Sequence, residues 1–121
     1  MNHIPLEKDA ILFLDGGMGT QLQGKGLQPG EMPEAWNVSR PKDILAVHEA
    51  YFKAGADIAY ANTFGANPAK YHGSAPIEDV IAAGVSIARE AATTVGGKRG
   101  VALDIGPTGR LLKPFGDFEF D

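Results

Sequence analysis

The sequence has 121 residues, a formal net charge of −4 and no cysteine. Its length suits one domain, and its composition, 44% hydrophobic and 21% charged, is that of an ordinary globular protein rather than a disordered or fibrous one. The missing cysteines exclude disulfides, thiolate metal sites and a cysteine nucleophile, and the acidic balance disfavours nucleic acid and anionic membrane surfaces as partners.

The first predicted elements are a strand and a helix. The apolar run Ile11-Leu-Phe-Leu14 does not alternate with polar residues, which is typical of a buried parallel strand. The helix begins near Pro41, a favoured first-turn residue, and Gly55 suits a left-handed cap at its end. Apolar side chains and one histidine share a face of this helix at Ile44, Leu45, His48, Tyr51 and Phe52. We interpret His48 as a core residue.

A second strand and helix and a third strand follow. The strand is predicted at Ile58–Ala61, the helix from Pro76 to the glycines at 96 and 97, and the last strand at Val101–Ile105. This alternation predicts an α/β fold with a parallel sheet. Three strands and two helices leave apolar faces without cover, which indicates an incomplete unit of a larger fold. The alternative is a small domain that dimerises through those faces.

A glycine-rich loop follows the first predicted strand. Loops at the carboxyl ends of parallel strands carry the site in such folds. Asp15 could hold an ammonium group, and the backbone amides of Gly16, Gly17 and Met18 could hold a carboxylate. The alternative is a tight turn in which Asp15 caps Thr20 or nearby amides. The glycine spacing fits neither common phosphate-binding loop.

Polar residues also follow the other two strands. Asn62 and Thr63 could hydrogen-bond a polar ligand, although an Asn/Thr turn explains them equally well. The segment Gly106-Pro107-Thr108 could form a third wall of the same cleft. Asp104 lies in an apolar strand and needs a partner, for which Arg110 is the nearby candidate. The histidines lack metal-ligand spacing, so we assign no metal ligand and no catalytic residue.

Five motifs in one order give the sequence a family resemblance. They are Asp15-Gly-Gly-Met-Gly-Thr20, Glu34-Ala-Trp-Asn37, His48-Glu-Ala-Tyr51 with Ala54-Gly-Ala-Asp57, Asn62-Thr-Phe-Gly65 and Ile105-Gly-Pro-Thr-Gly109. Together they resemble the homocysteine S-methyltransferase family. That family includes the homocysteine-binding module of cobalamin-dependent methionine synthase and betaine–homocysteine methyltransferase.

The resemblance implies a (βα)8 TIM barrel. Residues 1–121 would form a partial homocysteine-binding barrel domain, truncated after the third strand. In this family the aspartate matching Asp15 binds the homocysteine amine and the adjacent backbone amides bind its carboxylate. The substrate-binding residues implied by the match are Asp15, Gly16, Gly17, Met18, Asn62, Thr63, Gly106, Pro107 and Thr108.

The resemblance also implies a zinc-dependent transferase that makes methionine from homocysteine and a methyl donor. The family holds zinc through three cysteines in later strands, and this chain has none, so we expect these residues alone to be inactive. The expected partners are homocysteine and a methyl-donor module of the cobalamin or methyltetrahydrofolate type. The alternative function is a non-enzymatic half-barrel that dimerises and binds a small amino acid.

The expected location is cytoplasmic. The longest apolar run is too short to span a membrane, and the first residues lack the pattern of a signal peptide. A third reading, a phosphate-binding α/β domain, is disfavoured by the acidic charge and by the spacing of the glycines.

Overall fold

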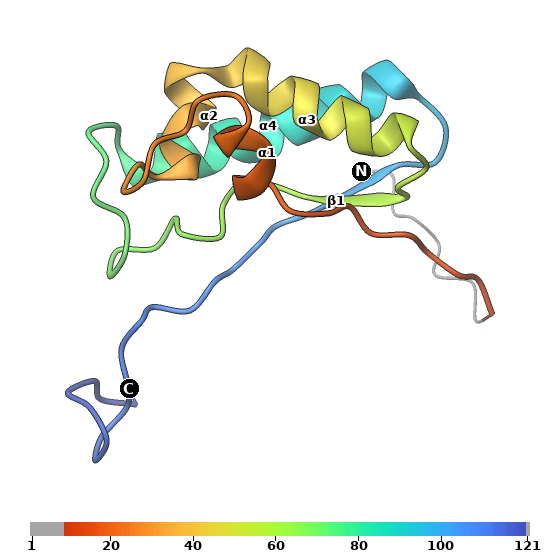
Figure 1. The fold of residues 1–121 in the computed structure, drawn as a ribbon. Coiled ribbons are helices and arrows are strands. Elements are labelled where there is room, and N and C mark those ends of the chain that lie inside the picture. Colours follow the sequence, from red (N-terminus) through yellow and green to blue (C-terminus); the bar gives the residue numbers. More distant parts are fainter. Residues whose placement is uncertain (1–8, 121) are drawn as a thin grey trace.

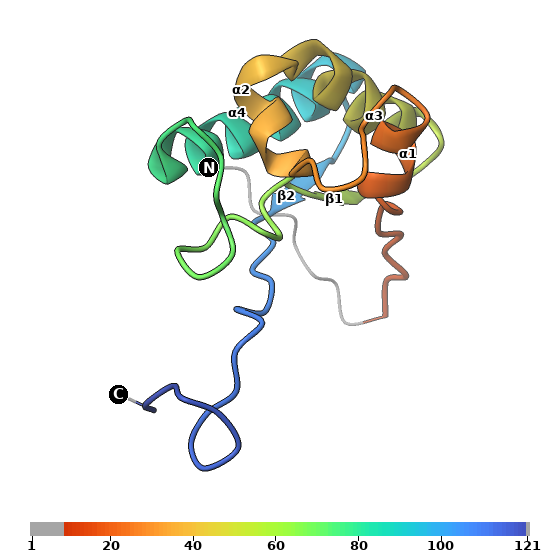
Figure 2. The same ribbon diagram turned by 60° about the vertical axis from the view of Figure 1, so that its left-hand side comes forward.

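Helices lie on one side of a short parallel sheet in the computed structural model, which describes residues 9–120 (Figure 1). Two long helices, α3 and α4, form most of the helical layer, and the strands run beneath them (Figure 2). The elements in chain order are α1 (Gly19–Gln23), the 3-10 helix η1 (Pro33–Ala35), α2 (Trp36–Ser39), α3 (Pro41–Lys53), β1 (Ile58–Tyr60), α4 (Ile77–Val95) and β2 (Gly100–Ala102).

The sheet contains two parallel strands within the described residues, so the prediction of three strands is wrong in its count. β1 pairs with β2 in a register that places Ala59 opposite Val101. The predicted first strand lies beside β1, but only Leu14 forms a bridge, to Ile58. The ladder stops there because the Phe13 N–H donates to the Asp57 carboxylate, at 2.9 Å, instead of to a backbone carbonyl.

The third strand is shorter than predicted. It ends at Ala102, whereas the sequence predicted it to reach Ile105. Beyond Ala102 the Asp104 N–H bonds to the Thr63 hydroxyl at 3.1 Å instead of to a carbonyl of β1. The Asp104 N–H is therefore bonded to the Thr63 side chain at the point where the backbone pairing of the two strands would have continued.

Both predicted helices are present at the predicted positions. α3 begins at Pro41, and Gly55 just beyond its end has φ +113°, the left-handed conformation that glycine adopts without strain. α4 begins after Pro76 and ends before Gly96, where φ is +78°. Of the helices in the described part of the chain, none is long and apolar enough to cross a membrane.

The core lies between α3 and α4 and between these helices and the sheet. Phe52 is fully buried and packs in one cluster with Ala56, Ala59 and Ala91. A second cluster joins the segments before α3 to both long helices through Leu22, Leu27, Trp36, Ile44, Val47 and Ile87. His48 is also fully buried, as the prediction of a core histidine requires.

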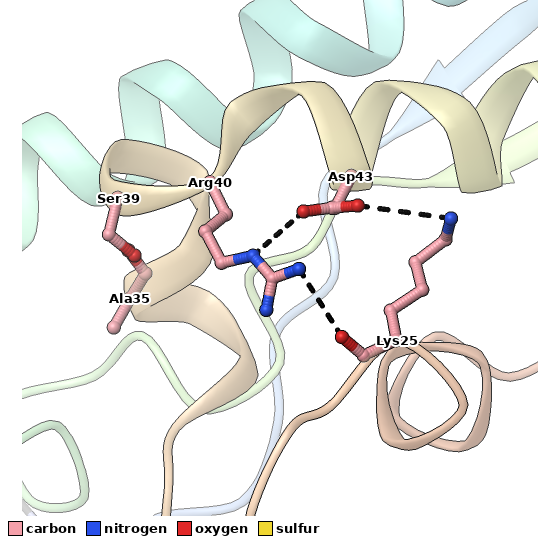
Figure 3. Close-up of polar contacts among 5 residues, drawn as sticks. All are labelled: Lys25, Ala35, Ser39, Arg40 and Asp43. Atoms are coloured by element: carbon pink, nitrogen blue, oxygen red, sulfur yellow. Dashed lines mark hydrogen bonds and ion pairs between the residues drawn. The ribbon is translucent and has the colours of Figure 1, made fainter.

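A polar cluster at the junction of α2 and α3 holds the loop between α1 and η1 in place (Figure 3). The Arg40 Nε donates to Asp43 at 2.8 Å, and its Nη2 donates to the Lys25 carbonyl at 3.2 Å. The Arg40 guanidinium also stacks over the Trp36 ring, 3.8 Å from its centroid. These groups are partly exposed, so each pair contributes little stability, but together they hold the chain between α1 and α3 in place.

The face of the sheet opposite the helices is uncovered, as the sequence predicted. Ala59 faces the helices, whereas Leu14 and Tyr60 lie on the other face of the sheet and are 52% and 41% exposed. Beyond β2 the chain leads away from the helices and ends in a separate loop (Figures 1 and 2). This loop is closed by a bridge between Leu112 and Phe118.

Candidate functional site

A cavity of about 330 Å³ lies where the glycine-rich loop meets the end of β1. It is lined by residues 15–19, by Pro33 and Glu34, by residues 60–64 and by Asp104. The structure thus brings together Asp15, Gly16, Gly17, Met18, Asn62 and Thr63, the predicted site residues of the first two loops. A small polar ligand fits this volume.

Asp15 presents a carboxylate to the cavity at the end of its extended segment. Its backbone N–H donates to the Ile58 carbonyl at 3.0 Å, and one carboxylate oxygen accepts from the Tyr60 N–H at 3.2 Å. Burial raises the pKa of Asp15, the Tyr60 N–H and its own backbone N–H act in the opposite direction, and the charge of Asp104 adds to the rise. The side chain therefore bonds across to β1, and it does not cap Thr20.

The glycines of this loop let the backbone approach α3. A Cβ at residue 16 would lie 2.8 Å from the Tyr51 hydroxyl oxygen, so a side chain there would require the Tyr51 ring to move. The same hydroxyl donates to the Gly17 carbonyl at 2.8 Å. Within the described chain, the N–H groups of Gly16 and Gly17 donate to no acceptor. They are free to bind an anionic group in the cavity.

Asn62 is held by protein partners on its nitrogen. Its Nδ2 donates to the Pro33 carbonyl at 2.8 Å and to the Asn37 Oδ1 at 2.9 Å. Asn37 is itself buried and donates to the Asn62 and Val80 carbonyls. Both amide hydrogens of Asn62 are thus occupied, so this side chain can offer a ligand only its oxygen.

Thr63 links the second loop to the third. Its hydroxyl donates to the Asp104 carbonyl at 2.8 Å and accepts from the Asp104 N–H at 3.1 Å. The hydroxyl is therefore used within the protein, and the Thr63 side chain positions Asp104 at the rim of the cavity.

The third predicted loop lies apart from this cavity. Gly106 lines an adjacent hollow of about 210 Å³, and Pro107 and Thr108 line neither of the two. The predicted pairing of Asp104 with Arg110 is wrong. Arg110 instead forms an ion pair with Asp117 at 3.7 Å, because the closed loop of residues 111–118 brings that carboxylate back to it.

Glu34 belongs to one of the five motifs, but the sequence predicted no role for it. Glu34 is only 4% exposed, lines the cavity and accepts the Gly65 N–H at 2.7 Å. A Cβ at residue 65 would lie 2.9 Å from the same oxygen, so Gly65 permits this approach. The available signal was the position of Glu34 at the start of the motif Glu34-Ala-Trp-Asn37.

The residues present do not fit a zinc ion. The whole chain lacks cysteine. Over residues 9–120, no group of three or more histidine, aspartate or glutamate side chains is placed to hold a metal. His48 is enclosed in the core, where burial lowers its pKa to about 4, and it does not line the cavity.

The chain is similar in sequence and in fold to several known proteins. The chain is 36% identical to methionine synthase of Mycobacterium tuberculosis over 122 residues, which cover 91% of the chain and 10% of that protein. It is 30% identical to homocysteine S-methyltransferase of Escherichia coli, over 96% of the chain and 41% of that protein. The oxidized form of the homocysteine methyltransferase MmuM from Escherichia coli superposes with a TM-score of 0.75 at 31% identity, over 87% of the chain and 40% of that structure.

A family model described as homocysteine S-methyltransferase matches residues 12–121. This match covers nearly the whole chain and confirms the resemblance carried by the five motifs. The chain spans less than half the length of the relatives it matches. The chain belongs to the homocysteine S-methyltransferase family.

Proposed function

We propose that this chain is the homocysteine-binding part of a zinc-dependent methyltransferase that makes methionine. The observation that carries the proposal is the pairing, in one cavity, of the Asp15 carboxylate with the free backbone amides of Gly16 and Gly17. An amino acid carries an ammonium group and a carboxylate on the same carbon. The two kinds of group in the cavity complement those two charges.

The rest of the cavity suits a short apolar side chain. Met18, Ala61 and Phe64 line it beside the polar groups. In the proposed complex Asp15 binds the ammonium group, the amides of the glycine loop bind the carboxylate, and the sulfur-bearing chain of homocysteine lies along these apolar residues. The roles of Asn62, Gly106, Pro107 and Thr108 as substrate contacts stay predictions.

Activation of the sulfur is assigned to residues outside this chain. A zinc ion would bind the thiol as a thiolate, which is the nucleophilic form, but the residues here do not hold one. We propose that the zinc ligands and a methyl-donor site of the methyltetrahydrofolate or cobalamin type belong to other parts of the enzyme. The 121-residue chain alone is then expected to bind homocysteine without methylating it.

We also propose that further strands of a (βα)8 barrel cover the exposed face of the sheet. The support is the exposure of Leu14 and Tyr60 on that face and the chain's coverage of 40% of the matched MmuM structure. The homodimer expected from the same surface stays a prediction, and sedimentation of the chain measures it directly. The cytoplasmic location also stays a prediction.

Replacing Asp15 with asparagine is expected to weaken homocysteine binding. The substitution removes the charge that faces the ammonium group, while the asparagine oxygen can still accept the Tyr60 N–H. The loss of one charged hydrogen bond is about 1.5–3 kcal/mol, or roughly tenfold to a hundredfold in affinity. Backbone amide shifts of the isotope-labelled chain, followed during titration with homocysteine under a reductant, give the dissociation constants.

Asp117→Asn serves as the matched control, because Asp117 is exposed and lies outside the cavity. It removes the same charge and should leave the dissociation constant unchanged. Equal affinities of wild type and Asp15→Asn would refute the role of Asp15. If the wild-type chain did not bind homocysteine at all, the proposed function of the cavity would be wrong.

A further inference from the structure

Glu34 is a buried acid in the cavity wall, and only one of its two carboxylate oxygens accepts a hydrogen bond from the described residues. The side chain is 4% exposed, and one oxygen accepts the Gly65 N–H at 2.7 Å. Within residues 9–120 the other oxygen accepts no hydrogen bond. It is also not fully enclosed by the protein. This second oxygen therefore has access to open space, and Glu34 lines the cavity.

No positive charge of the described chain compensates this acid. Glu34 takes part in none of the ion pairs of residues 9–120. Three acids, Asp15, Glu34 and Asp104, line the cavity, and no lysine, arginine or histidine lines it. A buried carboxylate is costly unless it is paired, so the cavity favours a ligand that brings a cation.

The cation is better matched by an ammonium group than by a metal ion. A metal requires several ligand atoms that converge on one point, and the described acids form no such group. An ammonium group has three N–H donors that point in different directions, so it can bond to oxygens on separate walls. Asp15 and Glu34 come from two separate loops that border the same cavity.

We propose that Glu34 is a second carboxylate for the ammonium group of the amino-acid ligand, and that it determines the preference of the site for a free α-amine. This inference rests on the proposed function. Asp15 and Glu34 each accept one ammonium N–H. The Gly65 N–H holds Glu34 by its other oxygen and so fixes its direction.

The competing role for Glu34 is purely structural, as an anchor for the turn at Gly65. Glu34→Gln separates the two roles, because the glutamine oxygen can still accept the Gly65 N–H while the charge is lost. The matched control is Glu90→Gln, an exposed acid on α4 that lies outside the cavity. Thermal unfolding of each variant reports whether the fold is retained.

The test compares two ligands in the intact 121-residue chain. Wild type, Glu34→Gln and Glu90→Gln are each titrated with L-homocysteine and with 4-mercaptobutanoate, which is homocysteine without its amino group. We expect Glu34→Gln to bind homocysteine about tenfold or more weakly, with 4-mercaptobutanoate affinity unchanged or improved. Glu90→Gln should match wild type for both ligands.

Other outcomes overturn the inference in distinguishable ways. If Glu34→Gln weakens both ligands equally, Glu34 is a structural anchor and has no contact with the amine. If it changes neither affinity, the second oxygen does not reach the ligand. In both cases wild type still prefers homocysteine, and the proposed function stands. If wild type binds homocysteine and 4-mercaptobutanoate equally or binds neither, the amine site itself is wrong, and the proposed function fails with it.

Discussion

Phe52→Ala is expected to lower the free energy of unfolding by about 3–5 kcal/mol. Phe52 is fully buried on α3 and packs against Ala56, Ala59 and Ala91, which are all too small to fill the space that the ring would leave. The variant therefore loses the transfer free energy of the ring and also leaves a cavity. Urea unfolding followed by circular dichroism measures the change. The slope of the free energy of unfolding against urea concentration should be the same in the variant and in wild type.

Phe13→Ala is the matched control for this measurement. It removes the same ring from an exposed position beside β1, where Phe13 is 65% exposed. The expected change is within about 0.5 kcal/mol. A loss from Phe13→Ala as large as that from Phe52→Ala would mean that Phe13 is covered in solution, and repeating the measurement at several protein concentrations would show whether a second copy covers it.

Lowering the pH from about 6.5 to about 4 is expected to destabilise the chain through His48. Burial lowers the pKa of His48 from 6.5 to about 4, so the unfolded chain takes up a proton over this range and the folded chain does not. The stabilising effect of the neutral histidine is complete above pH 6.5, falls as the pH decreases and levels off below the folded pKa. The loss from this group is about 3 kcal/mol at most.

His48→Leu tests this assignment. Both ring nitrogens of His48 are enclosed without a partner in the described structure, so an apolar side chain of similar size removes two unsatisfied polar atoms. We expect the variant to be at least as stable as wild type at pH 7 and to have a flatter pH dependence between 4 and 6.5. His72→Leu, at an exposed position, should retain the wild-type slope. An unchanged slope in His48→Leu would assign the acid sensitivity to other groups.

The helices could be predicted from the sequence because their signals are local. Proline starts α3, glycine in a left-handed conformation follows it, and the buried side chains recur at helical spacing. The strands depend on distant partners instead. The segment at Ile11–Leu14 is apolar enough for a strand, but the Asp57 side chain takes the Phe13 N–H and limits the pairing to Leu14. Nothing near Phe13 in the sequence reveals that competition.

The candidate site could be predicted where it follows the strand ends. Asp15 and the adjacent glycines share a cavity with Asn62 and Thr63, as the rule for parallel strands implies. Gly106 lies beside another hollow because the chain leaves the sheet after Ala102. The burial of Glu34 depends on its contact with Gly65, far along the chain, so its local sequence could not show it.

The close approach of the glycine loop to α3 has an evolutionary consequence. A side chain at position 16 would collide with the Tyr51 ring, whose hydroxyl also holds the Gly17 carbonyl. A larger residue at position 16 would therefore require the Tyr51 ring to move or a smaller residue at position 51, and either change would weaken the hold of Tyr51 on the loop. We expect the two positions to covary among relatives, with glycine accompanying tyrosine, so the ligand-binding loop cannot diversify independently of the helix behind it.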